Sequence, residues 1–445
     1  MLQADGPRVG ETSAHRRSKH IVLKTLAAVG VGALLVHGSR LWLKVFGSNL
    51  PYGMPQPPND PLDSSEFVRF LGITTGAAEH PGTKIEILRN GREFYPAELS
   101  LIRSATKAVN LLFYEFEKGD IAGEFLEALT ARCRAGVKVK LVVDAMGSFG
   151  TGDSYFDGLR AAGGQMKWYR PLGWETWTHM DNRTHRKLLI ADGNVAFIGG
   201  AGIADRWMRP GPWGPAWRDT MLRVEGAAVS ALLSVFSQNW VECSGDILSG
   251  AEQFPPLGNP GACRSLVINS TPHGGSTRAR ILFQTLLDCS GRSIRITNPY
   301  FLPDRSARRA LIRAMRQRNV SVQVITAGPL IDHPSVTNLS EAICLELLEA
   351  GAEIYEYQPE MIHAKLMVVD GIWSVAGSTN FDHRSFALND EVNIATLDAN
   401  LAAELESDFA NDLKKCVRRT IHQERTRSMT GRLVGAVSKL SRREM

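Results

Sequence analysis

The sequence reads His185-Arg-Lys187-Leu-Leu-Ile-Ala-Asp192-Gly-Asn-Val-Ala-Phe-Ile-Gly199-Gly200 in its first half. A second stretch, 178 residues further along, reads His363-Ala-Lys365-Leu-Met-Val-Val-Asp370-Gly-Ile-Trp-Ser-Val-Ala-Gly377-Ser378. The spacing of histidine, lysine and aspartate is the same in both. A motif that is repeated with one spacing indicates that the chain contains two copies of one structural unit.

Both stretches predict a local geometry that suits a phosphate ester. The four apolar residues after each lysine, at 188–191 and 366–369, are typical of a buried strand. Alternate residues of a strand share a face, so the histidine and lysine of each copy are expected to project toward one space. The glycines that follow allow close approach of the backbone. Lysine supplies positive charge, and histidine can attack phosphorus or carry a proton.

The same order of predicted elements precedes each motif. The first half has a strand at 109–113, a helix at 120–134, a strand at 137–143, a helix near 153–162 and a strand at 166–169. The second half has a strand at 294–297, a helix at 305–318, a strand at 320–325, a helix from about 339 to 351 and a strand at 353–357. This order predicts a duplicated α/β unit.

The repeated motif resembles the signature of the phospholipase D superfamily, and the resemblance extends over about residues 95–415. The segments at 298–303, 355–359 and 381–386 are most similar to the bacterial cardiolipin synthases of that superfamily. The resemblance implies an α/β fold with two similar phospholipase D-like domains, each a mixed β-sheet flanked by helices. It relates the domains by a pseudo-two-fold axis, with one active site at their interface.

Composition and the repeat predict six segments along the chain. They are a basic N-terminal segment with a possible membrane anchor (1–46), a linker and lead-in (47–94), the first phospholipase D-like domain (95–245), a linker (246–262), the second phospholipase D-like domain (263–415) and a basic amphipathic tail (416–445). Residues 47–64 are rich in proline, glycine, asparagine and aspartate, which is typical of a linker.

Positive charge is concentrated at the two ends of the chain. Residues 1–44 have a net charge of +5 and residues 413–445 one of +8, whereas the whole chain has +5. The body at 45–412 is therefore acidic, at −8, which disfavours a nucleic-acid surface. Basic ends suit an anionic membrane surface better, and we expect no nucleic-acid partner.

Two segments are candidates for membrane contact. The mostly apolar run at 21–36 is short for a spanning helix and lacks a clean small-x-small cleavage site. In the tail, apolar residues recur on one face of a helix among basic ones: Met429, Leu433, Val437 and Leu440. Packing of either helix on the body is the alternative. We expect a bacterial-type cell membrane location, through the N-terminal anchor or by peripheral association.

The resemblance implies a catalytic set of six residues: His185, Lys187, His363, Lys365, Asp192 and Asp370. In such a site one histidine, here His185, attacks phosphorus, and the other exchanges a proton with the alcohols. The lysines stabilise the phosphoryl oxygens, and neither a metal nor another cofactor is implied. The two aspartates follow their lysines by five residues, a position that favours fixing the turn over chemistry.

The resemblance also implies an acidic partner for each histidine downstream of its motif. We assign Glu391 to His363 and Asp219 to His185. Such an acid holds one ring nitrogen while the other reacts.

The predicted phosphate-binding residues are Ser378, Asn380 and Gly200. The first motif has Gly202 where the fuller pattern has asparagine. The two halves of the phosphate site are therefore expected to be unequal.

Several other residues have two interpretations from sequence. Five tryptophans near the first motif either line a lipid groove or pack in the core: Trp174, Trp177, Trp207, Trp213 and Trp217. The pair Asp332-His333 precedes a predicted helix and either contacts a headgroup or caps that helix. The six cysteines are scattered, without a C-x-x-C pair, so we expect reduced thiols and no zinc site.

The function predicted from these features is that of a phosphatidyltransferase resembling cardiolipin synthase. It would join phosphatidylglycerol to a second lipid alcohol through a covalent phosphohistidine. One alternative is a phospholipase D that hydrolyses phospholipids, which differs only in the acceptor. A nuclease or phosphodiesterase of the same superfamily is disfavoured by the acidic body, and a non-enzymatic membrane-surface protein is disfavoured by the intact motifs.

Overall fold

The computed structural model describes residues 52–171, 173, 182–272, 277–332 and 343–426. The candidate anchor at 21–36 and the amphipathic part of the tail lie outside these residues. Among the described residues, no helix is long and apolar enough to cross a membrane. The structure below is that of the unit that begins at Pro51.

Each half of the described chain contributes strands to one continuous sheet. The first half has β1 (Glu79–Arg89), β2 (Ala108–Phe113), β3 (Lys138–Asp144), β4 (Gln165–Tyr169), β5 (Lys187–Ala191), β6 (Val195–Gly199) and β7 (Thr220–Glu225). The second half has β8 (Cys263–Ser270), β9 (Ser293–Thr297), β10 (Ser321–Ala327), β11 (Glu353–Tyr357), β12 (Leu366–Val369), β13 (Trp373–Gly377), β14 (Glu391–Leu397) and β15 (Cys416–Arg418).

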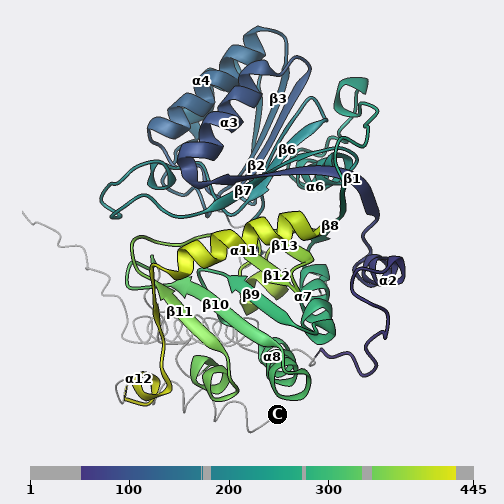
Figure 1. Ribbon diagram of the computed structural model, residues 1–445. Helices are drawn as coiled ribbons and strands as arrows, with labels where there is room; N and C mark the ends of the chain where they lie inside the picture. The colour runs from purple at the N-terminus through teal and green to yellow at the C-terminus, as the bar shows by residue number, and fades with distance from the viewer. Residues whose placement is uncertain (1–51, 172, 174–181, 273–276, 333–342, 427–445) are drawn as a thin grey trace, which may run out of the picture. The chain divides into compact units, whose positions relative to one another are not determined.

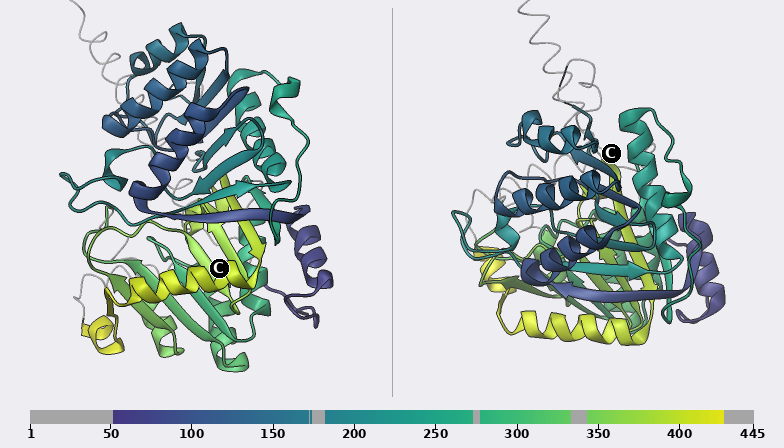
Figure 2. Two further views of the ribbon diagram at one scale, coloured as in Figure 1. Left: turned by 45° about the horizontal axis from the view of Figure 1, so that its top comes forward. Right: turned by 90° about the horizontal axis from the view of Figure 1, so that it is seen from above.

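The order of strands is the same in both halves when it is read outward from the centre. The first half runs β1-β7-β6-β5-β2-β3-β4, and the second runs β8-β14-β13-β12-β9-β10-β11 with β15 at its edge. Strands β1 and β8 pair antiparallel at the centre, as Figure 2 shows for the long strand β1 between the halves. Strands β2-β3-β4 and β9-β10-β11 are parallel. Two copies of one unit related by a pseudo-two-fold axis produce this order.

Helices cover the sheet and also lie between the halves (Figure 1). The helices are α2 (Ser65–Thr75), α3 (Asn90–Ser104), α4 (Asp120–Arg134), α5 (Asp157–Ala161), α6 (Ala228–Ser244), α7 (Arg278–Cys289), α8 (Arg305–Arg318), α10 (His383–Ala387), α11 (Ala399–Leu413) and α12 (Ile421–Thr426). Helices α3 and α4 pack on the first half, and α7 and α8 pack on the second. Helices α6 and α11 contribute to a third core that contains side chains of both halves, including Leu188, Ile198, Val368 and Ile394.

Several elements have the bounds that the sequence predicts. Helices α4 and α8 and strand β11 are confirmed at both ends, and strands β2, β3, β4, β9 and β10 are confirmed within a few residues. The helix predicted near 153–162 is a 3-10 turn at Asp153–Phe156 followed by α5. Periodicity and helix-stop residues are strong in these segments, which is why they could be assigned.

The central strand β1 was not predicted. The segment expected to be a linker and lead-in contains α2, β1 and the start of α3. Pro81-Gly82 looks like a turn in the sequence, but the register of β1 against β8 shifts at this point and the strand continues. Pro96 likewise suggests a break, yet it lies inside α3.

The beginning of the predicted tail belongs to the second half. Strand β15 pairs antiparallel with β11, and Arg419 Nη2 lies 2.8 Å from the buried carboxylate of Glu424. The boundary predicted at residue 416 therefore falls too early. Hydrophobic patterning could not identify a three-residue edge strand.

Candidate active site

Two short backbone bridges join the halves beside the motif histidines. Isolated parallel bridges form between residues 184 and 390 and between residues 218 and 362. The His185 N–H donates to the Asp390 carbonyl at 2.9 Å, and the His363 N–H donates to the Arg218 carbonyl at 2.7 Å. Each bridge therefore places a histidine beside the residue that follows its backbone acceptor.

The residue that follows each acceptor is the acid that holds the histidine. Glu391 Oε1 lies 3.1 Å from His185 Nδ1, and Asp219 Oδ2 lies 2.9 Å from His363 Nδ1. The predicted pairing of Glu391 with His363 and of Asp219 with His185 is therefore wrong. That prediction took each acid from the half that contains its histidine, whereas the bridges bring it from the opposite half.

Each histidine is held as a neutral ring with one defined reactive nitrogen. A carboxylate can only accept, so Nδ1 of each ring carries the proton and Nε2 keeps its lone pair. Burial, together with Lys187, lowers the pKa of His185 to about 4. Burial, together with Lys365, lowers the pKa of His363 to about 4. Both rings are therefore neutral at pH 7 before substrate binds and able to act as nucleophile or base.

The two supporting acids are ionised although they are fully buried. Burial opposes the charged form of Glu391, but His185, Lys187 and the Ser378 hydroxyl hold its pKa below the usual value. Burial also opposes the charged form of Asp219, but His363 and Lys365 hold its pKa below the usual value. Each acid can therefore stabilise positive charge that develops on its histidine.

The two motif lysines bring positive charge next to the histidines. Burial, together with the Lys365 charge, lowers the pKa of Lys187 to about 7, and burial lowers that of Lys365 to about 8. Their ammonium groups donate to the carbonyls of His185 (2.6 Å) and His363 (2.5 Å). Lys365 Nζ also lies 3.0 Å from His363 Nε2. Two like charges raise each other's free energy, so a bound phosphodiester anion would stabilise both.

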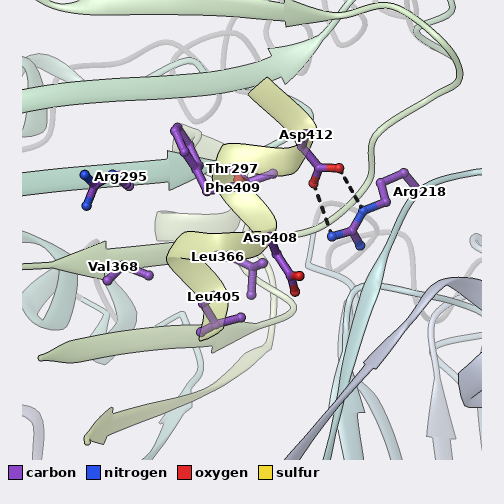
Figure 3. Close-up of a pocket in the computed structure, with 9 residues that line it drawn as sticks. All are labelled: Arg218, Arg295, Thr297, Leu366, Val368, Leu405, Asp408, Phe409 and Asp412. Atoms are coloured by element: carbon purple, nitrogen blue, oxygen red, sulfur yellow. Dashed lines mark hydrogen bonds and ion pairs between the residues drawn. The ribbon is translucent and has the colours of Figure 1, made fainter. Parts of the chain in front are cut away.

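Two buried arginines fix the backbone of the supporting acids. Arg186 Nε donates to the Glu391 carbonyl at 3.3 Å, and Arg218 Nη1 donates to the Asp219 carbonyl at 2.5 Å. Arg218 also forms an ion pair of 3.2 Å with Asp412 of α11, as Figure 3 shows. Arg186 therefore holds Glu391 from the opposite half, and the ion pair of Arg218 with Asp412 ties the segment of Asp219 to the second half.

The pocket in Figure 3 is distinct from the histidine site. It lies beneath α11 and is lined by charged side chains such as Arg295 and Asp408, together with apolar ones that include Leu366 and Val368 of β12. Leu366 and Val368 alternate with Lys365 along the chain, so their side chains project from the opposite face. The pocket therefore does not contain the reacting groups.

The two motif aspartates lie at the far ends of their strands. The carboxylate of Asp192 accepts hydrogen bonds from the backbone N–H groups of residues 106, 107 and 108. The carboxylate of Asp370 accepts from those of residues 291, 292 and 293. Both residues have positive φ, 51° and 56°, at hairpin turns that continue into glycine. These carboxylates therefore fix turns, and their inclusion in the expected catalytic set is corrected.

The predicted phosphate-binding residues have different environments. The Ser378 hydroxyl donates to Glu391 Oε2 and accepts from the Val392 N–H, so it orients the acid that holds His185. Asn380 Oδ1 is buried and has no hydrogen-bond partner in the described part of the chain. A Cβ on Gly200 would lie 2.7 Å from Asp219 Oδ1, so glycine leaves room for the acid of His363. Binding of phosphate by these residues stays a prediction.

Aromatic rings surround both histidines. The Tyr114 ring lies 5.2 Å from that of His185, and the rings of Trp207 and Trp217 lie 5.5 Å from that of His363. Trp207 Nε1 also donates to Asp219 Oδ2 at 3.0 Å. Of the five tryptophans with two interpretations, these two pack in the core. Trp174 and Trp177 lie outside the described residues.

Sequence reasoning missed two charged residues beside the site. Glu115 is the second residue after β2, and its Oε1 lies 3.0 Å from Arg206 Nη2. The Arg206 guanidinium lies 5.1 Å from the ring of Trp217 and also pairs with Glu117. The signal for Glu115 was its position after a buried strand that lies next to the first motif strand. In the described residues, no group of three or more His, Cys, Asp or Glu side chains is arranged to hold a metal.

Comparisons with known proteins agree with this geometry. The family described as cardiolipin synthase, PLD-like domain, matches residues 99–239 and 283–413. The cardiolipin synthase of Listeria monocytogenes serotype 4a (strain HCC23) is 30% identical over 378 residues, 84% of this chain and 78% of the relative. The cardiolipin synthase of Halalkalibacterium halodurans is 32% identical over 364 residues, 80% of this chain and 71% of the relative.

A solved structure shares the fold at low sequence identity. The phosphatidylserine synthase of Haemophilus influenzae Rd KW20 has a TM-score of 0.64 with 13% identity. The match covers 85% of this chain and 98% of that protein. At this identity the likeness concerns the fold alone.

Proposed function

The chain belongs to the cardiolipin synthase, PLD-like domain family and is a phospholipase D-type phosphatidyltransferase; from this we propose that it joins phosphatidylglycerol to a second lipid alcohol. The crossed histidine–acid pairs are the observation that carries the proposal. Transfer through a covalent intermediate needs one nucleophile and one proton-exchanging group in the same site, and the pairs at His185 and His363 supply them.

The proposed first step forms a covalent phosphohistidine. His185 Nε2 attacks phosphorus, a P–N bond forms, and the P–O bond to the glycerol headgroup breaks. His363, protonated, gives its proton to the departing glycerol oxygen. The phosphodiester anion favours this protonated form because it adds negative charge beside the ring. Glu391 stabilises the positive charge that develops on His185.

The second step returns the site to its starting state. His363 takes the proton of the acceptor hydroxyl, whose oxygen attacks phosphorus, and the P–N bond breaks. Lys187 and Lys365 stabilise the phosphoryl oxygens in both steps. Lys365 Nζ lies within hydrogen-bond distance of His363 Nε2, whereas within the described residues the side chain that hydrogen-bonds to His185 is Glu391, at Nδ1. This difference supports His185 as the nucleophile.

We also propose that the loops at the carboxyl ends of β3 and β10, beside the histidines, face an anionic membrane. Phe149 is 77% exposed and Leu330 is 42% exposed, in the loops that follow the corresponding strands β3 and β10. The first loop contacts the site region because Ser148 Oγ donates to the Tyr114 carbonyl at 3.1 Å. Asp332, two residues after Leu330, accepts from Tyr300, whose ring lies 6.5 Å from His363. Acyl chains of a bound lipid would need such an apolar rim.

Product analysis tests the proposed reaction. Purified protein is incubated with phosphatidylglycerol dispersed in detergent, and the phospholipids and free glycerol are quantified. Transfer releases one glycerol for each diphosphatidyl lipid formed. Phosphatidate as the sole lipid product would indicate hydrolysis instead, and the absence of turnover would contradict both reactions.

A further inference from the structure

Glu115 and Arg206 lie along one flank of the histidine pair. Glu115 follows Tyr114, whose ring lies 5.2 Å from His185. Arg206 lies 5.1 Å from the ring of Trp217, which itself lies 5.5 Å from His363. The ion pair between them, at 3.0 Å, therefore connects the surroundings of the two histidines.

Glu115 lies against Gly202, a position at which the second copy of the motif has a larger residue. A Cβ added at Gly202 would lie 2.9 Å from Glu115 Cβ and 3.0 Å from the Glu115 carbonyl. The corresponding position of the second motif is Asn380. One flank of the site thus carries an amide, and the other carries a carboxylate with a guanidinium.

The charge of Glu115 decides which kind of group it can bind. Burial raises the pKa of Glu115 to about 7, although Arg206 and Lys187 oppose that shift. An ionised carboxylate would repel the phosphodiester, but it accepts hydrogen bonds from hydroxyl groups. Arg206 donates, and its buried Nε has no hydrogen-bond partner in the described part of the chain. An acceptor beside an unused donor suits two neighbouring hydroxyls.

We propose that Glu115 and Arg206 form a binding subsite for the vicinal diol of a polyol alcohol entering or leaving the site. Glu115 accepts a hydrogen bond from one hydroxyl, and Arg206 donates to the oxygen of its neighbour. The pair acts on selectivity, because it favours a diol over water or a simple alcohol at the phosphohistidine. The inference rests on the proposed transferase reaction and specifies its acceptor class.

A competition experiment tests this subsite. The enzyme acts on detergent-dispersed phosphatidylglycerol with equal concentrations of labelled glycerol and propan-1-ol, and the two phosphatidyl products are counted. Both products come from one intermediate, so their ratio does not depend on the amount of active enzyme. Glu115→Gln keeps an acceptor oxygen but removes the charge, so it is expected to lower the glycerol-to-propanol ratio by about tenfold, because a hydrogen bond to a charged group is about twice as strong as one to a neutral group.

Matched variants separate binding from structure. Glu117→Gln removes the more exposed carboxylate that also pairs with Arg206, and the product ratio should stay as in the wild type. Arg206→Lys keeps the positive charge but loses the planar guanidinium, whose separate nitrogens can donate to Glu115 and to a hydroxyl at once, so it should lower the ratio as Glu115→Gln does. An unchanged ratio in both Glu115→Gln and Arg206→Lys, or an equal fall in Glu117→Gln, would overturn the subsite.

Failure of the proposed reaction would be recognised separately. A wild-type enzyme that forms phosphatidate alone, with neither alcohol product, contradicts the transferase. In that case, added glycerol should still bind at the pair and slow the release of phosphatidate. At the same glycerol concentration, the wild type should be slowed more than Glu115→Gln. Equal inhibition of both proteins by glycerol would reject the diol subsite as well.

Discussion

His185 Nδ1 lies 3.1 Å from Glu391 Oε1, although 206 residues separate them in the chain. His363 and Asp219 form the reciprocal pair at 2.9 Å. Neither half therefore contains a histidine that is held by its own acid. Backbone bridges on the adjacent residues form only when the two halves dock. Docking therefore assembles the reacting groups, and the duplicated fold produces a single site.

Loss of either supporting acid should reduce turnover with little loss of structure. Glu391→Gln and Asp219→Asn keep the shape of the side chain but remove the charge that favours a positive histidine. We expect each to lower kcat by about 10²- to 10⁴-fold. Steady-state rates with phosphatidylglycerol, beside thermal unfolding of each variant, measure this. A normal kcat in either variant would contradict the role of the crossed pairs.

The motif aspartates should affect stability and not chemistry. Asp192→Ala removes a carboxylate that accepts three backbone N–H groups. We expect the free energy of unfolding to fall by about 1–3 kcal/mol, as measured by urea titration. The turnover of the remaining folded protein should equal that of the wild type. A large fall in kcat with unchanged stability would return Asp192 to the catalytic set.

The lysines should give the reaction an alkaline limit. Lys187 has its pKa lowered to about 7 and Lys365 to about 8, so their positive charge is lost as the pH rises through these values. We expect kcat/KM to be highest below this range and to fall above it. Lys187→Arg keeps the charge at all of these pH values and should move the decline upward. An identical pH profile in that variant would assign the limit to another group.

Exposed apolar side chains beside the site should promote membrane binding. Phe149 is 77% exposed beside the site, and Ile73, 74% exposed on α2, is a control of matching exposure. Phe149→Ser is expected to weaken sedimentation with phosphatidylglycerol vesicles by about tenfold, because burial of a phenyl ring contributes about 1.5–3 kcal/mol. Ile73→Ser should bind as the wild type does. An equal effect of both substitutions would show that the loop of Phe149 contacts lipid no more than α2 does.

Much of the fold follows from the repeated pattern, because its strands and helices have clear periodicity and stop signals. Strand β1 could not be assigned in this way, since Pro81 and Gly82 interrupt the segment that pairs the two halves. The two catalytic histidines and the two lysines can be predicted from the motif alone. The pairing of each histidine with the distant acid depends on the docking of the halves. Local spacing in the sequence contains no information about that contact.

Trapping the covalent intermediate tests the central claim most directly. Enzyme mixed with labelled phosphatidylglycerol is quenched in alkali during turnover, and its peptides are mapped for a phosphatidyl group on histidine. We predict the label on His185, with no label in His185→Ala. Label on His363 would reverse the roles of the two histidines, and turnover without any histidine adduct would contradict the covalent mechanism.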